Sequence, residues 1–172
     1  LEDVTENQKT SLTRKVNETR MKQIVDEYER AIQQLKELLL DVSKEEMVIC
    51  VDPHTNDLDC VSIQSILSHV ICASNNYVIE IRRLQGENLQ SKSKKVLETI
   101  TDYIQGLDNA FLSNVNLFND YPDLVLEEND HNKKMKVSWG QSYDPEQLLE
   151  HAIVHILRHR RQIERFLLKI RT

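Results

Sequence analysis

Glycine and proline are scarce in this chain, since each occurs only three times in 172 residues. Average usage would give roughly 12 glycines and 9 prolines in a chain of this length. β-Sandwiches, barrels and doubly wound sheets need frequent turns, and these two residues supply many of them. The composition therefore excludes those folds. It also excludes glycine-rich phosphate loops, because no G-x-G or G-K-[ST] motif occurs.

Apolar residues recur at three- and four-residue spacing in four segments, the pattern of amphipathic helices. The predicted helices run over about 11–41, 62–85, 94–118 and 145–170. Ser62 and Asp144 are the expected N-caps of the second and fourth helices, and Pro145 is suited to the first helical position. Gly86 is placed to end the second helix. Four such helices predict an all-α four-helix bundle.

The length suits one ordinary domain, so we expect residues 1–172 to form a single four-helix-bundle domain. Residues 1–15 are mostly polar and are expected to fray. Two connections are long, namely 42–61 and 119–143, and the second contains the single tryptophan, Trp139. Loops of this length in a compact domain tend to cover a functional site or to cross over the fold.

The net charge of −6 argues against a nucleic-acid-binding surface. The basic residues within 158–165 lie among acidic ones, so we interpret them as a solvated helix face. No apolar run approaches 18 residues, so we expect no membrane span. Three cysteines without a CxxC spacing, and the lack of a recognisable signal peptide, favour reduced thiols and a cytoplasmic location. The cysteines are Cys50, Cys60 and Cys72.

Three histidines are spaced by four on the last predicted helix: His151, His155 and His159. Neighbours at this spacing share a helix face and can bind one metal ion together. His151 and His159 are about 12 Å apart along the axis, too far to share an ion. On a helical wheel His159 and His155 lie roughly 50° and 90° from the apolar centre, and His151 roughly 130°. The interior pair is therefore His155 and His159, with His151 at the rim.

A third ligand must come from another helix, and His69 lies at the margin of the apolar stripe of the second one. Three histidines with open positions are the composition of a reactive metal site. The alternative is that each of these imidazoles is a hydrogen-bonded core residue. His54 and His131 lie in polar loops, and we interpret both as solvated.

The segment from His155 to Ile163, HILRHRRQI, resembles the last-helix signature H-x-x-x-H-R-G-Q-[IV] of the DinB/YfiT-like family. The segment ILSH, which ends at His69, resembles the family's L-L-x-H on the second helix. The resemblance covers helices two to four and implies a four-helix bundle. It also implies a divalent metal ion, zinc or nickel, bound by His69, His155 and His159. Some members of the family use a small-molecule thiol in transferase or isomerase reactions.

The chain departs from the family pattern in three respects. Arg161 replaces the glycine of the signature, and His151 is an additional histidine. Family bundles also have a long crossover after the second helix. Here only about a dozen residues separate Leu84 from Val96, and these reach at most roughly 40 Å. The family topology is therefore strained on the predicted boundaries.

The catalytic residues are unknown from the sequence, because every candidate also has a structural interpretation. Cys72 is either a thiol of the site or a small core residue, and Gln162 is suited to orienting its neighbours. Three polar candidates either point into the bundle or are solvated: Asp102, Gln105 and Asn109. Three aromatic candidates either line a pocket or are packing residues: Tyr77, Tyr103 and Trp139.

Three functions stay open. The first is a metal-dependent thiol transferase or hydrolase that acts on a small molecule at an open three-histidine site. The second is a non-catalytic metal-binding, ligand-binding or stress-related bundle. The third is a dimeric structural bundle with vestigial histidines. A homodimer is expected in any of these cases, because such bundles often pair through two helices.

Overall fold

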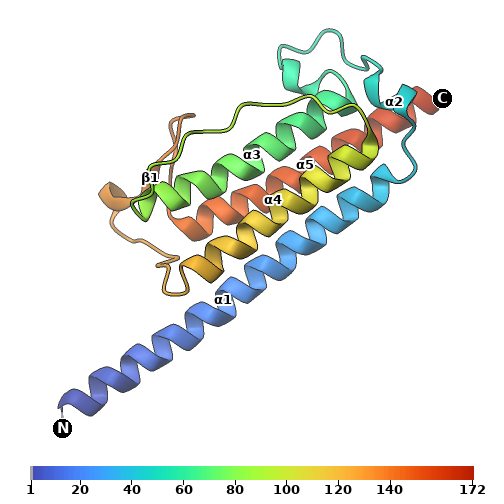
Figure 1. The fold of residues 1–172 in the computed structure, drawn as a ribbon. Coiled ribbons are helices and arrows are strands. Elements are labelled where there is room, and N and C mark those ends of the chain that lie inside the picture. Colours follow the sequence, from blue (N-terminus) through green and yellow to red (C-terminus); the bar gives the residue numbers. More distant parts are fainter. Residues whose placement is uncertain (1) are drawn as a thin grey trace.

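The computed structural model describes residues 2–172, with side chains from residue 14 onward. Four long helices form a bundle (Figure 1): α1 (Glu2–Leu39), α3 (Ile63–Leu84), α4 (Ile100–Asp120) and α5 (Pro145–Arg171). Helices α4 and α5 each pack against both α1 and α3. The predicted all-α bundle is confirmed. No helix of the described residues is both long and apolar enough to cross a membrane.

The long connections contain short elements: α2 (Lys44–Val48), the 3-10 turns η1 (Leu58–Cys60) and η2 (His131–Lys133), and the strands β1 (Met135–Lys136) and β2 (Ser142–Tyr143). The strands pair antiparallel, with Met135 opposite Tyr143, so residues 135–143 form a hairpin. Gly140 at its turn has a φ of +91°, a conformation that glycine adopts without strain.

The predicted helix ends follow from local hydrogen bonds. The Ser62 side chain accepts a hydrogen bond from the backbone N–H of Ser65, and Asp144 accepts one from Gln147. Gly86, with a φ of +94°, follows the end of α3. These caps are confirmed as predicted. The first helix begins at Glu2 rather than near residue 11. The frayed segment predicted over 1–15 falls largely outside the described side chains.

The third long helix begins at Ile100, so its predicted start at Lys94 is wrong. The Thr99 side chain caps it, and side chains of α3 form hydrogen bonds with the backbone of residues in the segment before it. Asn76 Oδ1 accepts a hydrogen bond from the backbone of Lys92 at 2.8 Å, and Gln64 donates to the carbonyl of Leu97 at 2.9 Å.

This later start lengthens the crossover, which we define as residues 85–99. Figure 1 shows it returning along the whole bundle, so that α3 and α4 run in the same direction. Its residues can span roughly 50 Å, whereas α3, with 22 residues, is about 33 Å long. The strain expected from the sequence is therefore absent.

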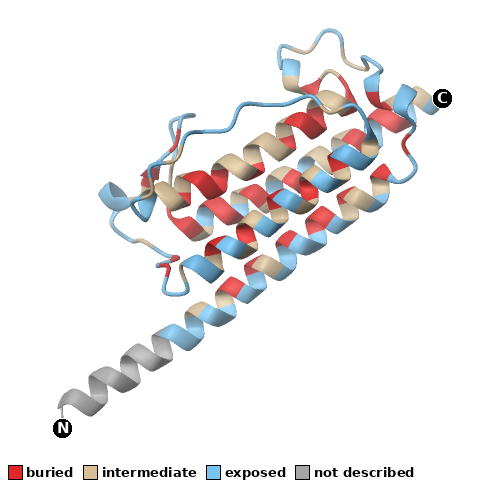
Figure 2. Cartoon of the chain, in the orientation of Figure 1, coloured by how far each residue is buried: buried red, intermediate tan, exposed pale blue. Residues whose placement is uncertain are grey.

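The inward faces of the four long helices share one hydrophobic core (Figure 2). Tyr28, Leu35, Ile66, Leu107 and Ile156 are among its most deeply buried side chains. Because α3 and α5 both pack into this core, their adjacent faces are held at a fixed separation. Any side chains that meet between these two helices are correspondingly well positioned.

Candidate metal centre

Three imidazole rings meet between α3 and α5. His69 comes from α3, while His155 and His159 lie one turn apart on α5. The Nε2 atom of His155 is 2.8 Å from that of His69 and 3.2 Å from that of His159. All three ligand atoms lie within 4.8 Å of one another, so this group could hold a metal ion. The structure thus brings together the three histidines named from the sequence, which we call the triad.

Two rings of the triad are fixed by hydrogen bonds from their outer nitrogens. His69 Nδ1 lies 3.1 Å from Asp59 Oδ2, and His159 Nδ1 lies 3.0 Å from Gln162 Oε1. An oxygen acceptor at Nδ1 favours the proton on that nitrogen, which leaves the Nε2 lone pair facing the other rings. The orienting role expected of Gln162 is therefore seen in the structure. Cys60 also donates to the same amide oxygen, with its Sγ at 3.6 Å.

The environment keeps the α5 imidazoles neutral. Burial lowers the pKa of His155 to about 3, with further lowering by the nearby His159 and His69. Burial likewise lowers the pKa of His159, again with a contribution from His69. His155 Nδ1 is buried and has no hydrogen-bond partner among the described residues. Neutral imidazoles are the form that binds metal, so a cation would displace no proton from these two rings at neutral pH.

Asp59 and Lys94 were not identified from the sequence. Burial alone would raise the pKa of Asp59, but its interactions with Lys94 and His69 together outweigh burial and hold that pKa below its usual value. Lys94 belongs to the crossover and forms an ion pair with Asp59. The crossover is thus linked to the triad through one carboxylate. Asp59 lies in an irregular connection, where no periodic pattern singles it out.

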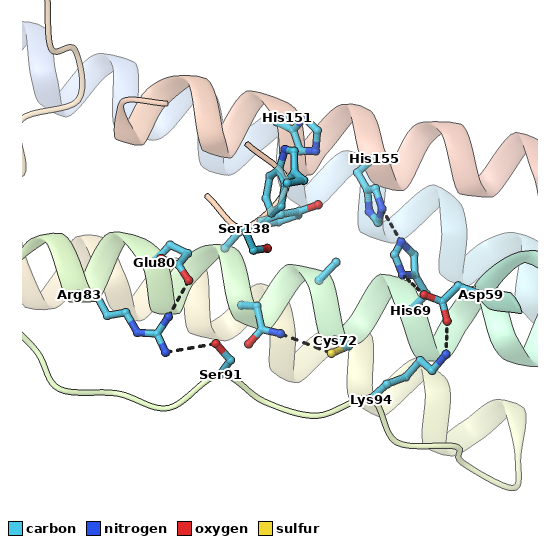
Figure 3. Close-up of a pocket in the computed structure, with 14 residues that line it drawn as sticks. Asp59, His69, Cys72, Glu80, Arg83, Ser91, Lys94, Ser138, His151 and His155 are labelled. Carbon is cyan, nitrogen blue, oxygen red and sulfur yellow. Dashed lines mark hydrogen bonds and ion pairs between the residues drawn. The ribbon is translucent and has the colours of Figure 1, made fainter. Parts of the chain in front are cut away.

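A cavity of about 690 Å³ adjoins the triad, and His69 and His155 form part of its wall. Figure 3 shows it between α3 and α5, with Asp59 and Lys94 at one end and Glu80 with Arg83 at the other. Tyr77, Trp139 and Cys72 also line it. The interpretation of Cys72 as a buried core residue is therefore wrong, because the residue is only partly buried and lines the cavity.

The other sequence candidates lie away from the triad. The polar residues Asp102, Gln105 and Asn109 are exposed on α4, as their solvated interpretation predicted. Tyr103 is a packing residue, buried and hydrogen-bonded to Ser68 at 2.7 Å. His54 and His131 are exposed.

The two departures from the family pattern on the last helix, His151 and Arg161, have clear positions. His151 lies half-buried on the cavity wall, next to the triad but outside it. Arg161, which stands where the family signature has glycine, is exposed on α5. Its side chain extends into solvent and therefore requires no space inside the bundle.

Comparison with known protein families identifies the family of this chain. No curated protein matches the chain. The model of the DinB family matches residues 21–168, a range that contains the three histidines and all of α3 and α4. Because the match covers most of the sequence, including the helices that carry the triad, this chain belongs to the DinB family.

Proposed function

We propose that the chain binds one divalent transition-metal ion through the Nε2 atoms of His69, His155 and His159, and that it acts on a small molecule as a metal-dependent transferase or hydrolase. The observation that carries this proposal is the convergence of three Nε2 atoms whose rings are held from behind by Asp59 and Gln162.

The donor set suits zinc or nickel, because imidazole nitrogen is a good ligand for both. Three neutral ligands leave the charge of the cation uncompensated and keep coordination positions open for a substrate. When bound, such an ion lowers the pKa of a coordinated water or thiol and polarises carbonyl groups. A small-molecule thiol is one substrate class consistent with this site.

The residues around the triad supply positioning and access. Asp59 and Gln162 fix the ring orientations, and the cavity gives a small molecule a path to His69 and His155. Tyr77 packs edge-on against His155, with ring centroids 5.9 Å apart. Burial raises the pKa of Tyr77 well above its usual value, so its hydroxyl stays protonated and can only donate or accept hydrogen bonds.

Elemental analysis of protein purified without an affinity tag tests the metal site. We expect about one equivalent of zinc or nickel in the parent, and strong loss in His69→Ala, His155→Ala and His159→Ala. The matched control is His151→Ala, one turn from His155 on the same helix, which should keep the metal. Full retention in the His155 variant would contradict the proposal.

Turnover assays with thiols and activated esters separate catalysis from binding alone. Metal without turnover would favour a binding protein, and absence of metal would favour a structural bundle. The homodimer expected from the sequence stays a prediction, which sedimentation of the purified protein can test. The cytoplasmic location likewise stays a prediction.

A further inference from the structure

Aromatic rings form one wall of the cavity beside the triad. Tyr77 comes from α3, His151 from α5 and Trp139 from the hairpin over residues 135–143. The Trp139 ring stacks on His151, with centroids 5.8 Å apart and planes inclined by 24°. It also meets Tyr77 edge-on at 5.9 Å. Trp139 nevertheless remains 46% exposed, so these contacts leave much of the indole accessible.

This wall offers apolar ring surface and one available hydroxyl. The indole N–H of Trp139 donates to Gln141 Oε1 at 3.2 Å, so the polar group of the indole is already satisfied. No hydrogen bond joins the Tyr77 hydroxyl to another group in the described part of the chain, and the residue as a whole is only 6% exposed. A buried phenol that lines a cavity without a protein partner is suited to donating to a ligand.

The position of Tyr77 links the aromatic wall to the triad. Its ring centroid is 5.9 Å from that of His155 and 5.9 Å from that of Trp139. A ligand that extends along the cavity from the triad towards the hairpin therefore passes Tyr77. The reacting group and the body of such a ligand would lie on opposite sides of this residue.

The charges of the cavity cancel except at the triad. Its four charged lining residues form two ion pairs, Asp59 with Lys94 and Glu80 with Arg83. The remaining lining side chains, apart from the histidines, carry no formal charge. A divalent cation bound by the triad would therefore be the one uncompensated charge. Such a cavity favours a ligand that is anionic at the triad end and uncharged along its body.

We propose that this cavity binds small aromatic acids, with the acidic group directed to the triad and the flat ring system against Tyr77 and Trp139. The Tyr77 hydroxyl donates a hydrogen bond to the acidic group. This inference rests on the proposed function, because it requires a metal ion at the triad. A volume of about 690 Å³ lies within the range of cavities that enclose small organic ligands.

Calorimetric titration of the zinc-loaded protein with two matched acids tests the ring preference. The probes are naphthalene-2-carboxylate and its saturated analogue decahydronaphthalene-2-carboxylate, which share a carbon skeleton and a carboxylate. We expect the flat acid to bind about fivefold more tightly, because stacking adds roughly 1 kcal/mol to apolar burial. Trp139→Leu should reduce this preference to within about twofold, and Trp139→Phe should keep most of it.

A second variant isolates the hydroxyl. Tyr77→Phe retains the ring and removes one donor, so it should weaken both acids equally, by about fivefold. Zinc content is measured for every variant and should stay at that of the parent. Thermal unfolding of each variant checks that the fold persists.

The outcomes distinguish this inference from the proposed function. Equal affinity for the two acids in zinc-loaded protein would overturn the aromatic preference while leaving the metal site intact. An unchanged preference in Trp139→Leu would do the same. A parent protein that binds no zinc would overturn the proposed function and this inference together.

Discussion

His151 and His155 lie one turn apart on the same helix, yet their surroundings differ. The His155 ring faces His69 from α3, and two Nε2 atoms approach it within 3.2 Å. The His151 ring instead stacks on Trp139, and its Nδ1 lies 3.4 Å from the Tyr143 hydroxyl. The two histidines themselves stack with centroids 6.2 Å apart. Spacing along α5 is therefore not sufficient for a metal ligand, because the element packed opposite each ring determines its role.

The largest expected difference between the two histidines is in thermal stability with metal. A ligand that binds only the folded state stabilises it by about 4 kcal/mol at a thousandfold excess over its Kd. We expect excess zinc to raise the unfolding temperature of the parent and of His151→Ala, and a chelator to reverse the rise. His155→Ala should show no zinc-dependent rise. If His151→Ala and His155→Ala showed the same zinc-dependent rise in unfolding temperature, the two histidines would not differ as metal ligands.

The pH dependence of the metal-free protein should also separate the two positions. The pKa of His155 in the folded state is lowered from 6.5 to about 3, so the unfolded chain takes up this proton first. The free energy of unfolding should therefore fall as the pH drops from about 6.5 towards 3, by about 4 kcal/mol. Chemical denaturation at several pH values measures this slope.

The matched variants sharpen the same pH experiment. His155→Gln should flatten the slope substantially, because an amide at this position cannot take up the proton. Burial lowers the pKa of His151 as well, so His151→Gln should change the slope in the same direction. Its effect should be smaller, since only at His155 is the shift large. A larger effect at His151 would contradict the comparison.

The carboxylate behind His69 should matter for metal affinity. Asp59→Asn keeps the size of the side chain but removes its charge, and losses of outer partners of metal ligands typically cost 10–100-fold in affinity. The corresponding change beside His151 is Tyr143→Phe, which should leave zinc affinity unchanged. Competition with a chromogenic chelator measures both. Equal affinities in parent and Asp59→Asn would show that Asp59 does not support the site.

The smallest expected effect concerns the crossover. Lys94 pairs with Asp59 but is itself 38% exposed, and such pairs contribute only about 0.5 kcal/mol. Lys94→Met should therefore weaken zinc binding about twofold, measured by the same competition. Lys95→Met, at the next residue of the crossover, is the control and should have no effect. A tenfold loss in the Lys94 variant would show that the crossover has a stronger influence on the triad.

The parts that could be predicted from the sequence depend on local chemistry. The caps at Ser62 and Asp144 require only neighbouring residues, and the pair His155 and His159 follows from helical spacing. Helical periodicity alone did not identify His69 as a ligand, because it placed this residue only at the margin of the apolar stripe of its helix. The family motif then associated it with the other two. The aromatic residues Tyr77 and Trp139 both pack and line the cavity, so their two interpretations were not exclusive.

The parts that could not be predicted depend on long-range packing. Val96 and Leu97 continue the apolar spacing of the third helix, which favoured its start at residue 94. In the structure Val96 is 67% exposed, and the Leu97 backbone bonds instead to Gln64 and to the Tyr103 hydroxyl. Asp59 and Lys94 meet only because the crossover returns along α3. Periodicity contains no information about such contacts between irregular segments.

The position of Trp139 has a practical consequence. It is the single tryptophan of the chain, and it lies on the cavity wall against His151 and Tyr77. Nearly all of the indole fluorescence of this protein therefore originates within the cavity. A change in emission on adding a small molecule would report occupancy of this one place, without any label or engineered probe. Quenching by a paramagnetic ion such as Ni²⁺, but not by Zn²⁺, would report loading of the neighbouring histidines.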